Sequence, residues 1–407
     1  MKPSDTFIDD PRPSGGWREV FAAFLWLGLT SFGGPVAHLG YFRSEFVERR
    51  RWLTEQAYAD LVALCQFLPG PASSQVGFAL GLLRGGPLGA AAAWTAFTLP
   101  SAIVLLLFAL GAAVIDGPIS QGSIHGLKVT AVAVVAHAVW GMARQLCPDS
   151  QRAGIALLAV LTVVVISGPS GQVLAIVVGA LAGLLLCRDA VASDTQALPT
   201  LVSQRAGIVA GALFVGLLLG LPLLAWISPL PALQVADAFY RAGALVFGGG
   251  HVVLPLLDAE VVQSGWVDAD VFLSGYGAAQ AVPGPLFTFA AYLGAVMTPL
   301  GGVLGAALAL ALIFLPGLLL LVAVLPHWQR FRGWRGAQAL MRGANAAVVG
   351  ILGAALYDPV WTSAILGPPE FALALTGFLL LTVWKLPAWA VVIVLAGGGL
   401  LISVLTG

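Results

Sequence analysis

Two short motifs of glycine and proline occur twice in this chain, and their chemistry suits an anion. Phe32-Gly33-Gly34 returns about 215 positions later as Phe247-Gly248-Gly249, and Pro69-Gly70-Pro71 returns as Pro283-Gly284-Pro285. Such residues interrupt helices. A helix that restarts after a break presents unpaired N–H groups and a partial positive charge, while glycine allows close approach. The motifs therefore predict sites that bind an oxyanion through the backbone.

Hydroxyl and amide side chains accompany both breaks, as an oxyanion site requires. The alternative for Pro-Gly-Pro is a packing kink between helices, but its duplication beside Phe-Gly-Gly favours a ligand role. We therefore predict a substrate site from the glycines of the motifs and the polar residues next to them: Gly33, Gly34, Gln66, Gly70, Ser73, Ser74, Gly248, Gly249, Gln280, Gly284 and Thr288.

Two basic residues lie in apolar surroundings and are further candidates for substrate binding. Lys128 either meets the anion or extends along the membrane interface. Arg241 is either the positive partner of a divalent anion or the partner of Asp237 at helical i−4 spacing. His137 lies inside a span, and we expect it to be a hydrogen-bonded core histidine.

Three residues are candidates for proton coupling. Glu260 has no basic residue nearby in sequence and is close to Asp258, so it is the preferred carboxylate for exchanging a proton in a partly dry site. Glu45 occupies the equivalent position in the first half, but Arg49 at i+4 favours a structural ion pair. His251 flanks the second glycine break and could titrate near neutral pH, or it is simply hydrogen-bonded.

The composition is that of a protein with many membrane-spanning helices. It is 59% hydrophobic and 9% charged, with a mean hydropathy of +0.95, so it has too little polar surface for a soluble domain. The 19 basic and 19 acidic residues balance, which argues against a nucleic-acid partner. Three separated cysteines indicate neither a metal site nor disulfides, and we expect no cofactor and no cleaved signal peptide.

Apolar stretches predict an all-α polytopic fold. Most approach the ~20 residues that a bilayer requires. They are residues 88–114, 127–146, 154–167, 172–187, 206–226, 303–325, 339–357, 371–384 and 388–405.

Positive charge predicts the topology, because basic loops stay in the cytoplasm. The basic groups assigned to the cytoplasm are Arg43, Arg49, Arg50, Arg51, Arg84, His327, Arg330, Arg332, Arg335 and Arg342, and the acidic residues assigned outside are Asp116, Asp258, Glu260, Asp268 and Asp270. If each interrupted region is a re-entrant hairpin, no loop violates this rule. If the regions cross fully, the loop of Arg49 to Arg51 lies outside, which the rule disfavours.

Both versions give the two halves opposite orientations. We predict an N-terminal repeat over residues 17–190, a linking helix over 206–226 and an inverted C-terminal repeat over 236–405. Inverted repeats are typical of secondary transporters. We expect a multi-pass protein of the inner (plasma) membrane, with its N-terminus in the cytoplasm and its C-terminus outside.

The motifs also resemble those of a known family. The run Phe32 to His38, then Arg43-Ser44-Glu45-Phe46-Val47, Gln66 to Pro71 and Leu99-Pro100, is similar to the chromate ion transporter family, as are Phe247 to His251, Gly265-Trp266-Val267 and Gln280 to Pro285. The resemblance implies a two-domain carrier with about thirteen membrane segments. It further implies export of chromate, with sulfate as a related substrate and protons as the coupling ion.

Other classes of protein are also compatible with parts of the pattern. A channel or exchanger for another small oxyanion would share the helix breaks but need no coupling acid. The chain contains no GxSxG, HExxH or GxxxxGK[ST] motif, which argues against an intramembrane enzyme and an ATP-driven pump. The expected partners are chromate or sulfate, protons and the lipid bilayer. A homodimer is left open.

Overall fold

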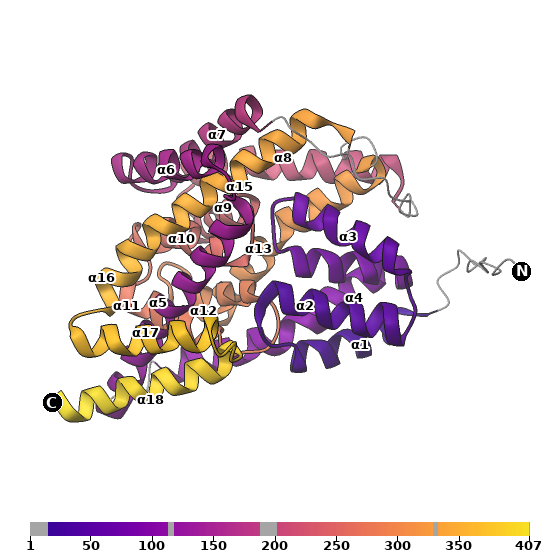
Figure 1. Ribbon diagram of the computed structural model, residues 1–407. Coiled ribbons are helices and arrows are strands. Elements are labelled where there is room, and N and C mark those ends of the chain that lie inside the picture. Colours follow the sequence, from indigo (N-terminus) through magenta and orange to yellow (C-terminus); the bar gives the residue numbers. More distant parts are fainter. Residues whose placement is uncertain (1–14, 113–117, 188–201, 329–332, 407) are drawn as a thin grey trace, which may run out of the picture.

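The computed structural model describes residues 15–112, 118–187, 202–328 and 333–406, and in these ranges the regular structure is entirely helical (Figure 1). Asp116, Arg330, Arg332 and residues 188–190 of the first repeat lie outside them. The first-half helices are α1 (Trp17–Thr30), α2 (Gly34–Arg43), α3 (Glu55–Phe67), α4 (Ala72–Ala112), α5 (Pro118–Leu146), α6 (Ser150–Val165) and α7 (Pro169–Leu186).

The next described helix is α8 (Gln204–Ile227), which lies on the predicted linking segment. The helices that follow it are α9 (Pro231–Ala244), α10 (Val253–Leu257), α11 (Ala269–Ala279), α12 (Phe289–Val296), α13 (Gly302–Val324), α15 (Arg335–Ala355), α16 (Thr362–Ala364), α17 (Pro368–Thr382) and α18 (Ala388–Thr406). Short π-helical segments continue α2 over Ser44–Arg49 and α10 over Asp258–Val262.

The nine predicted apolar stretches lie on helices over most of their length, and residues 113 and 114 of the first stretch lie outside the described ranges. Seven helices of the described residues are long and apolar enough to cross a membrane. The linking helix α8 is the most exposed of these, with 11% of its most apolar window buried. An apolar helix with so little protein around it fits a lipid environment. The chain is therefore a multi-pass membrane protein.

The predicted helix breaks are also present in both halves. α1 ends at Thr30 and α2 begins at Gly34, and α3 ends at Phe67 before α4 begins at Ala72. Both Phe-Gly-Gly motifs contain two successive glycines with positive φ, 102° and 77° for Gly33 and Gly34 and 74° and 150° for Gly248 and Gly249. Only glycine adopts such a pair without strain.

A third break divides α4 into two antiparallel arms. Gly85 and Gly86 are non-helical, and the arms 72–84 and 87–112 meet at Gly81 and Gly89, where a Cβ on either glycine would lie 2.4 or 2.3 Å from the other's carbonyl oxygen. α12 and α13 meet in the same way at Gly294 and Gly305. Glycine therefore allows the close helix approach that is typical of membrane proteins.

The interrupted helices of the first half have their own aromatic core. Phe24, Phe42, Phe46 and Phe97 are buried against one another, with Phe24 and Phe46 stacked at 4.9 Å between ring centroids. Aromatic pairs stabilise a core beyond the area that they bury. This cluster holds short helices together that could not span a bilayer alone.

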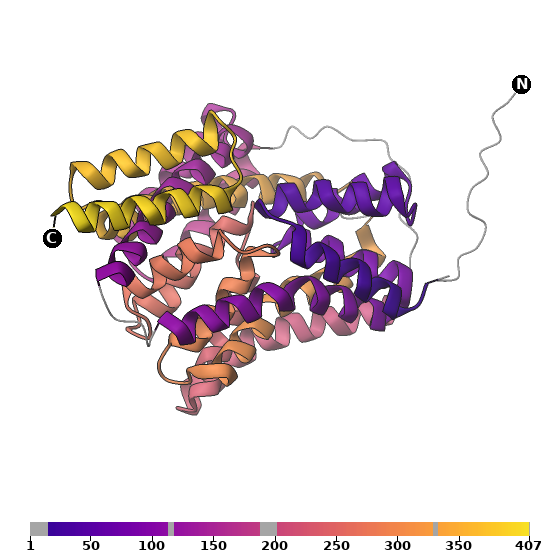
Figure 2. The same cartoon turned by 90° about the horizontal axis from the view of Figure 1, so that it is seen from below.

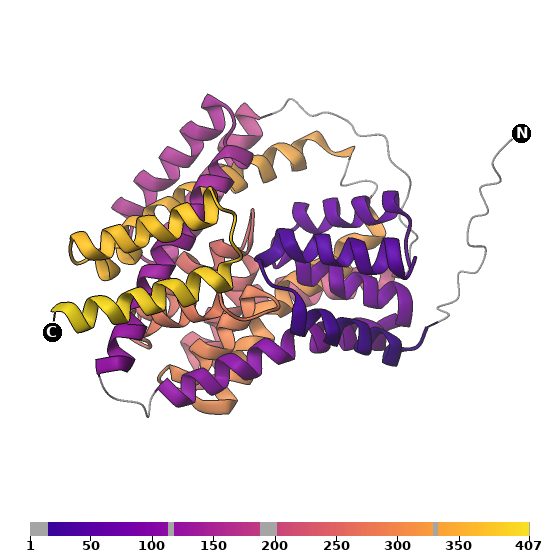
Figure 3. The ribbon, with the colours of Figure 1, turned by 60° about the horizontal axis from the view of Figure 1, so that its bottom comes forward.

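Ion pairs connect the helices at one end of this bundle. Glu19 of α1 contacts Arg50 (3.6 Å) and Arg84 (3.2 Å), and both guanidinium groups lie over the ring of Trp52. The start of α1, the loop after α2 and the turn inside α4 therefore lie together. Figure 1 shows α1 to α4 on the side of the N-terminus, and Figures 2 and 3 show α17 and α18 as a pair at the opposite end, beside α5.

Candidate functional site

The four predicted helix breaks meet in reciprocal pairs. The N–H of Gly70 donates to the carbonyl of Val246 at 2.7 Å, and the N–H of Gly284 donates to the carbonyl of Ser31 at 2.9 Å. Gly70 and Gly284 are equivalent in the repeat, and so are Ser31 and Val246. Each Pro-Gly-Pro turn is thus hydrogen-bonded to the residue before the Phe-Gly-Gly motif of the other half.

The packing contacts at the breaks, like the hydrogen bonds, connect each half to the other. A Cβ on Gly70 would lie 3.0 Å from Cα of Gly317, and a Cβ on Gly284 would lie 2.9 Å from Oγ of Ser101. Gly317 and Ser101 are equivalent in the repeat, because each follows the proline of a repeated Leu-Pro pair, Pro316 and Pro100. A Cβ on Gly250 would lie 3.2 Å from Cγ of its own equivalent, Pro35. Residues that are equivalent in the repeat therefore contact each other's surroundings in both directions, and Pro35 and Gly250 contact each other directly.

These contacts correct the expected role of two glycines. We predicted that the N–H groups of Gly70 and Gly284 face the anion, but both are used in hydrogen bonds between the halves. The positive φ values of 117° and 96° and the close neighbours explain why glycine is needed there. In this structure the two turns join the halves.

The Phe-Gly-Gly motifs, by contrast, keep their donors free. No described residue accepts a hydrogen bond from the N–H of Gly33, Gly34, Gly248 or Gly249. Gly33 is exposed, and the other three are half-buried. The two motifs are neighbours through Pro35 and Gly250, so four free donors lie around one junction.

Buried polar side chains surround the first break. His38 lies between the carbonyl of Ser31 (3.2 Å from Nε2) and the hydroxyl of Ser73 (3.4 Å from Nδ1), so it is hydrogen-bonded. Gln75 donates to the carbonyls of Pro69 (3.0 Å) and Gly317 (2.9 Å) and ties the halves further. The hydroxyls of Ser31 and Ser74 are buried and have no hydrogen-bond partner in the part of the chain that the structure describes.

A second polar cluster surrounds the other break. Nδ1 of His251 lies 2.8 Å from the hydroxyl of Tyr276, and Gln280 lies beside the same hydroxyl. Nε2 of Gln280 and Nδ1 of His137 have no hydrogen-bond partner among the described residues, so His137 is not the satisfied core histidine that we expected. Asn345 is also near, since its Oδ1 would lie 3.6 Å from a Cβ on Gly248.

Other predicted site residues lie apart from this junction or are already hydrogen-bonded to other residues of the protein. Nζ of Lys128 donates to Asp270 at 2.9 Å, an ion pair across 142 positions that local sequence did not reveal. The hydroxyl of Thr288 donates to the carbonyl of Pro285 at 2.8 Å, and Gln66 is exposed.

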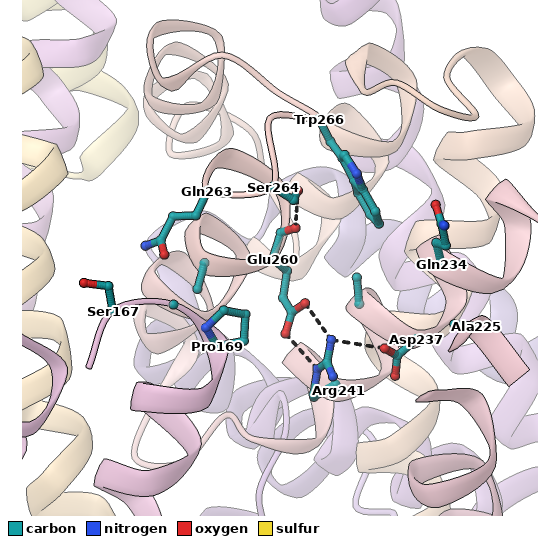
Figure 4. Close-up of a pocket in the computed structure, with 13 residues that line it drawn as sticks. Ser167, Pro169, Ala225, Gln234, Asp237, Arg241, Glu260, Gln263, Ser264 and Trp266 are labelled. Atoms are coloured by element: carbon teal, nitrogen blue, oxygen red, sulfur yellow. Dashed lines mark hydrogen bonds and ion pairs between the residues drawn. The ribbon is translucent and has the colours of Figure 1, made fainter. Parts of the chain in front are cut away.

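Arg241 and two carboxylates line a separate cavity of about 450 Å³ (Figure 4). Its wall comes from the α6–α7 loop, the end of α8, α9 and the π-helical segment Asp258–Val262 with the loop that follows. Arg241 binds Glu260 through two hydrogen bonds, Nε to Oε1 at 2.8 Å and Nη2 to Oε2 at 2.9 Å. Nη2 also lies 3.1 Å from Oδ2 of Asp237.

This arrangement overturns the expectation that Glu260 lacks a positive partner. α9 and the π-helical segment are consecutive arms of one interrupted region, so they bring Arg241 to a residue 19 positions later. The pairing of Arg241 with Asp237 at i−4 is confirmed. The predicted pairing of Glu45 with Arg49 is also confirmed, and Arg50 binds the same carboxylate with Nε 2.5 Å from Oε1.

Two polar residues of the second cluster did not stand out in the sequence. Tyr276 precedes Gln280, the C-cap residue of α11, by one helical turn, a spacing that places both side chains on the same side of the helix end. Asn345, on α15, occupies the position in the second half that is equivalent to that of Lys128 in the first half. Helical spacing and repeat alignment could therefore have indicated them.

Comparison with known proteins identifies relatives along nearly the whole chain. A chromate transport protein of Pseudomonas aeruginosa is 27% identical over 404 residues, covering 98% of this chain and 94% of the relative. A probable chromate transport protein of Synechococcus elongatus is 28% identical, with 95% and 94% covered, and a chromate transport protein of Cupriavidus metallidurans is 27% identical, with 92% and 90% covered. No solved structure matches the chain.

The family model described as chromate transporter matches twice, over residues 18–184 and over residues 233–402. The two matched segments hold the two sets of helix breaks, and the linking helix α8 lies between them. With these matches and the fold of its membrane helices, the chain belongs to the chromate transporter family.

Proposed function

We propose that this protein is a secondary transporter that exports chromate from the cytoplasm in exchange for protons, with sulfate as a related substrate. The observation that carries the proposal is the junction of the two Phe-Gly-Gly motifs, where four glycine N–H groups have no acceptor among the described residues. Free N–H groups at helix starts suit a tetrahedral dianion. Family membership supplies the identity of that anion.

The anion in this proposal contacts Gly33 and Gly34 from one half and Gly248 and Gly249 from the other. Gln280 contributes its amide nitrogen and Ser74 its hydroxyl, and neither atom has a hydrogen-bond partner among the described residues. Gly70 and Gly284 shape the site by joining the halves. A site that both halves build in equal parts can open to either side of the membrane when the halves rock against each other.

Two features support an inverted, re-entrant arrangement in the membrane. The start of α1, the loop of Arg50 and the turn at Gly85 meet at one end, as two hairpins that enter and leave on the same side require. The corresponding contact in the second half joins Thr298 to the carbonyl of Trp266 at 3.1 Å, and Trp266 is the equivalent of Trp52. We place the basic end in the cytoplasm, because positive loops stay inside.

Cysteine labelling tests this topology. Single cysteines at Arg50 and Gly85 should react with an impermeant maleimide only from the cytoplasm, and a cysteine at Ala269 only from outside. Labelling of Arg50→Cys from outside would replace the re-entrant hairpins by full crossings.

Transport in inside-out vesicles tests the function. Radiolabelled chromate should accumulate when the vesicle interior is made acidic, and an excess of sulfate should reduce the initial rate. Collapse of the pH gradient should abolish accumulation but leave exchange of internal for external chromate. Chromate current at fixed pH without dependence on a proton gradient would instead identify a channel.

A further inference from the structure

None of the residues that line the cavity of Arg241 belongs to the glycine junction. The polar wall of the cavity comes from α9, from the loop of Ser167 to Pro169 and from residues 259–266, the last of which belong to the acidic end of the second half. This inference rests on the proposed function, because it concerns the ion that drives transport.

Three charged side chains line the cavity, and their charges do not balance. Asp237 and Glu260 carry two negative charges, and Arg241 carries one positive charge. The side chain of Glu260 is 8% exposed, that of Asp237 13% and that of Arg241 30%. A net negative charge in such a setting is costly unless a cation compensates it.

The two carboxylates are held differently. Both oxygens of Glu260 accept a hydrogen bond from Arg241, and its carbonyl accepts one from Ser264 at 2.6 Å. Within the described ranges, Asp237 has one ion-pair contact, at 3.1 Å from Arg241, through Oδ2. Asp237 therefore has the more available oxygen atoms, and it lines the cavity directly.

No other charged group faces Asp237 across the cavity in the described residues. The loop of Ser167, α8 and residues 263–266 contribute neutral groups. Asp258, the second carboxylate of the π-helical segment, is not part of the lining and accepts a hydrogen bond from Nε2 of Gln263 at 3.2 Å. The compensating cation must therefore come from the solvent in the cavity.

We propose that Asp237, Arg241 and Glu260 form the proton site of the transporter, with the exchangeable proton on Asp237. A proton from water in the cavity binds the Asp237 carboxylate, while Arg241 stays on Glu260. The net charge of the three side chains changes from −1 to zero. The neutral site can then be enclosed away from water when the cavity closes, and the bound proton is carried toward the cytoplasm.

The described residues of the first half offer no equivalent site. Glu45 corresponds to Glu260, but it is bound by both Arg49 and Arg50, and Glu19 is bound by Arg50 and Arg84. Two carboxylates there meet three guanidinium groups. A proton is therefore not needed for charge balance at that end, so coupling is assigned to the second half alone.

Asp237→Asn tests the proposal, because asparagine resembles the protonated carboxyl group and cannot release a proton. In inside-out vesicles, chromate accumulation driven by a pH gradient should fall at least tenfold, whereas chromate exchange without a gradient should stay within twofold of wild type. Chromate-dependent proton movement, followed with a pH-sensitive dye, should disappear. Asp258→Asn is the matched control and should retain both coupling and exchange.

Asp237→Glu provides the second variant, since it keeps a carboxyl group if Asp237→Asn does not fold. It should retain proton-driven accumulation with a displaced pH profile. Proton-driven accumulation at the wild-type rate in Asp237→Asn would overturn the proposal, as would loss of exchange in a folded Asp237→Asn or loss of coupling in a folded Asp237→Glu. If the wild-type protein accumulates chromate independently of the pH gradient, or in response to a sodium gradient, the proposed proton coupling itself is overturned.

Discussion

Replacing Gly70 or Gly284 is expected to abolish chromate transport. Both residues have positive φ, 117° and 96°, and both donate the hydrogen bond that joins the two halves. Alanine at either position introduces backbone strain of ~1–3 kcal/mol, and its Cβ would meet Gly317 or Ser101. Leucine adds a side chain for which there is no space. Chromate uptake per folded molecule should fall more than ~10-fold, equivalent to more than ~1.4 kcal/mol.

Gly40→Ala is the matched control for these variants. Gly40 lies within α2, its φ is not positive, and a Cβ there would have nothing within 4 Å. Its uptake and thermal midpoint should equal those of wild type. Wild-type transport in both Gly70→Ala and Gly284→Ala would refute the junction as the point that couples the halves.

Arg241→Gln is expected to destabilise the protein strongly. Removal of the guanidinium group leaves two largely buried carboxylates without a positive partner, and loss of one partner of such a pair costs ~3–5 kcal/mol. The double variant Arg241→Gln with Glu260→Gln should recover much of that loss, because glutamine replaces the charge that lacks a partner. Thermal unfolding of the purified variants in detergent measures both effects.

A surface ion pair supplies the comparison for Arg241. Arg152 pairs with Asp149 at 2.6 Å, and the side chain of Asp149 is 44% exposed. Exposed pairs contribute ~0–1 kcal/mol, so Arg152→Gln should change the midpoint little. Equal small effects of Arg152→Gln and Arg241→Gln would show that the Arg241 cluster is solvated and is not a closed charge site.

The sequence determined the features that depend on local chemistry and on the repeat. Apolar length predicted the membrane helices, since a bilayer accepts only long apolar segments. Glycine and proline predicted all four breaks, because they restrict or release the backbone at their own position. The i,i+4 spacing likewise predicted that Glu45 pairs with Arg49, and it offered the pairing of Asp237 with Arg241 as one of two alternatives for Arg241.

Only the tertiary structure decided which donors are free and which charges are paired. The partner of the Gly70 N–H is 176 positions away, and that of Lys128 is 142 positions away, so neither follows from spacing along one helix. Glu260 looked unpaired for the same reason, because Arg241 reaches it only when the two arms of an interrupted helix fold against each other. Local rules describe a helix and its ends, whereas hydrogen bonds and ion pairs between helices depend on how those helices pack.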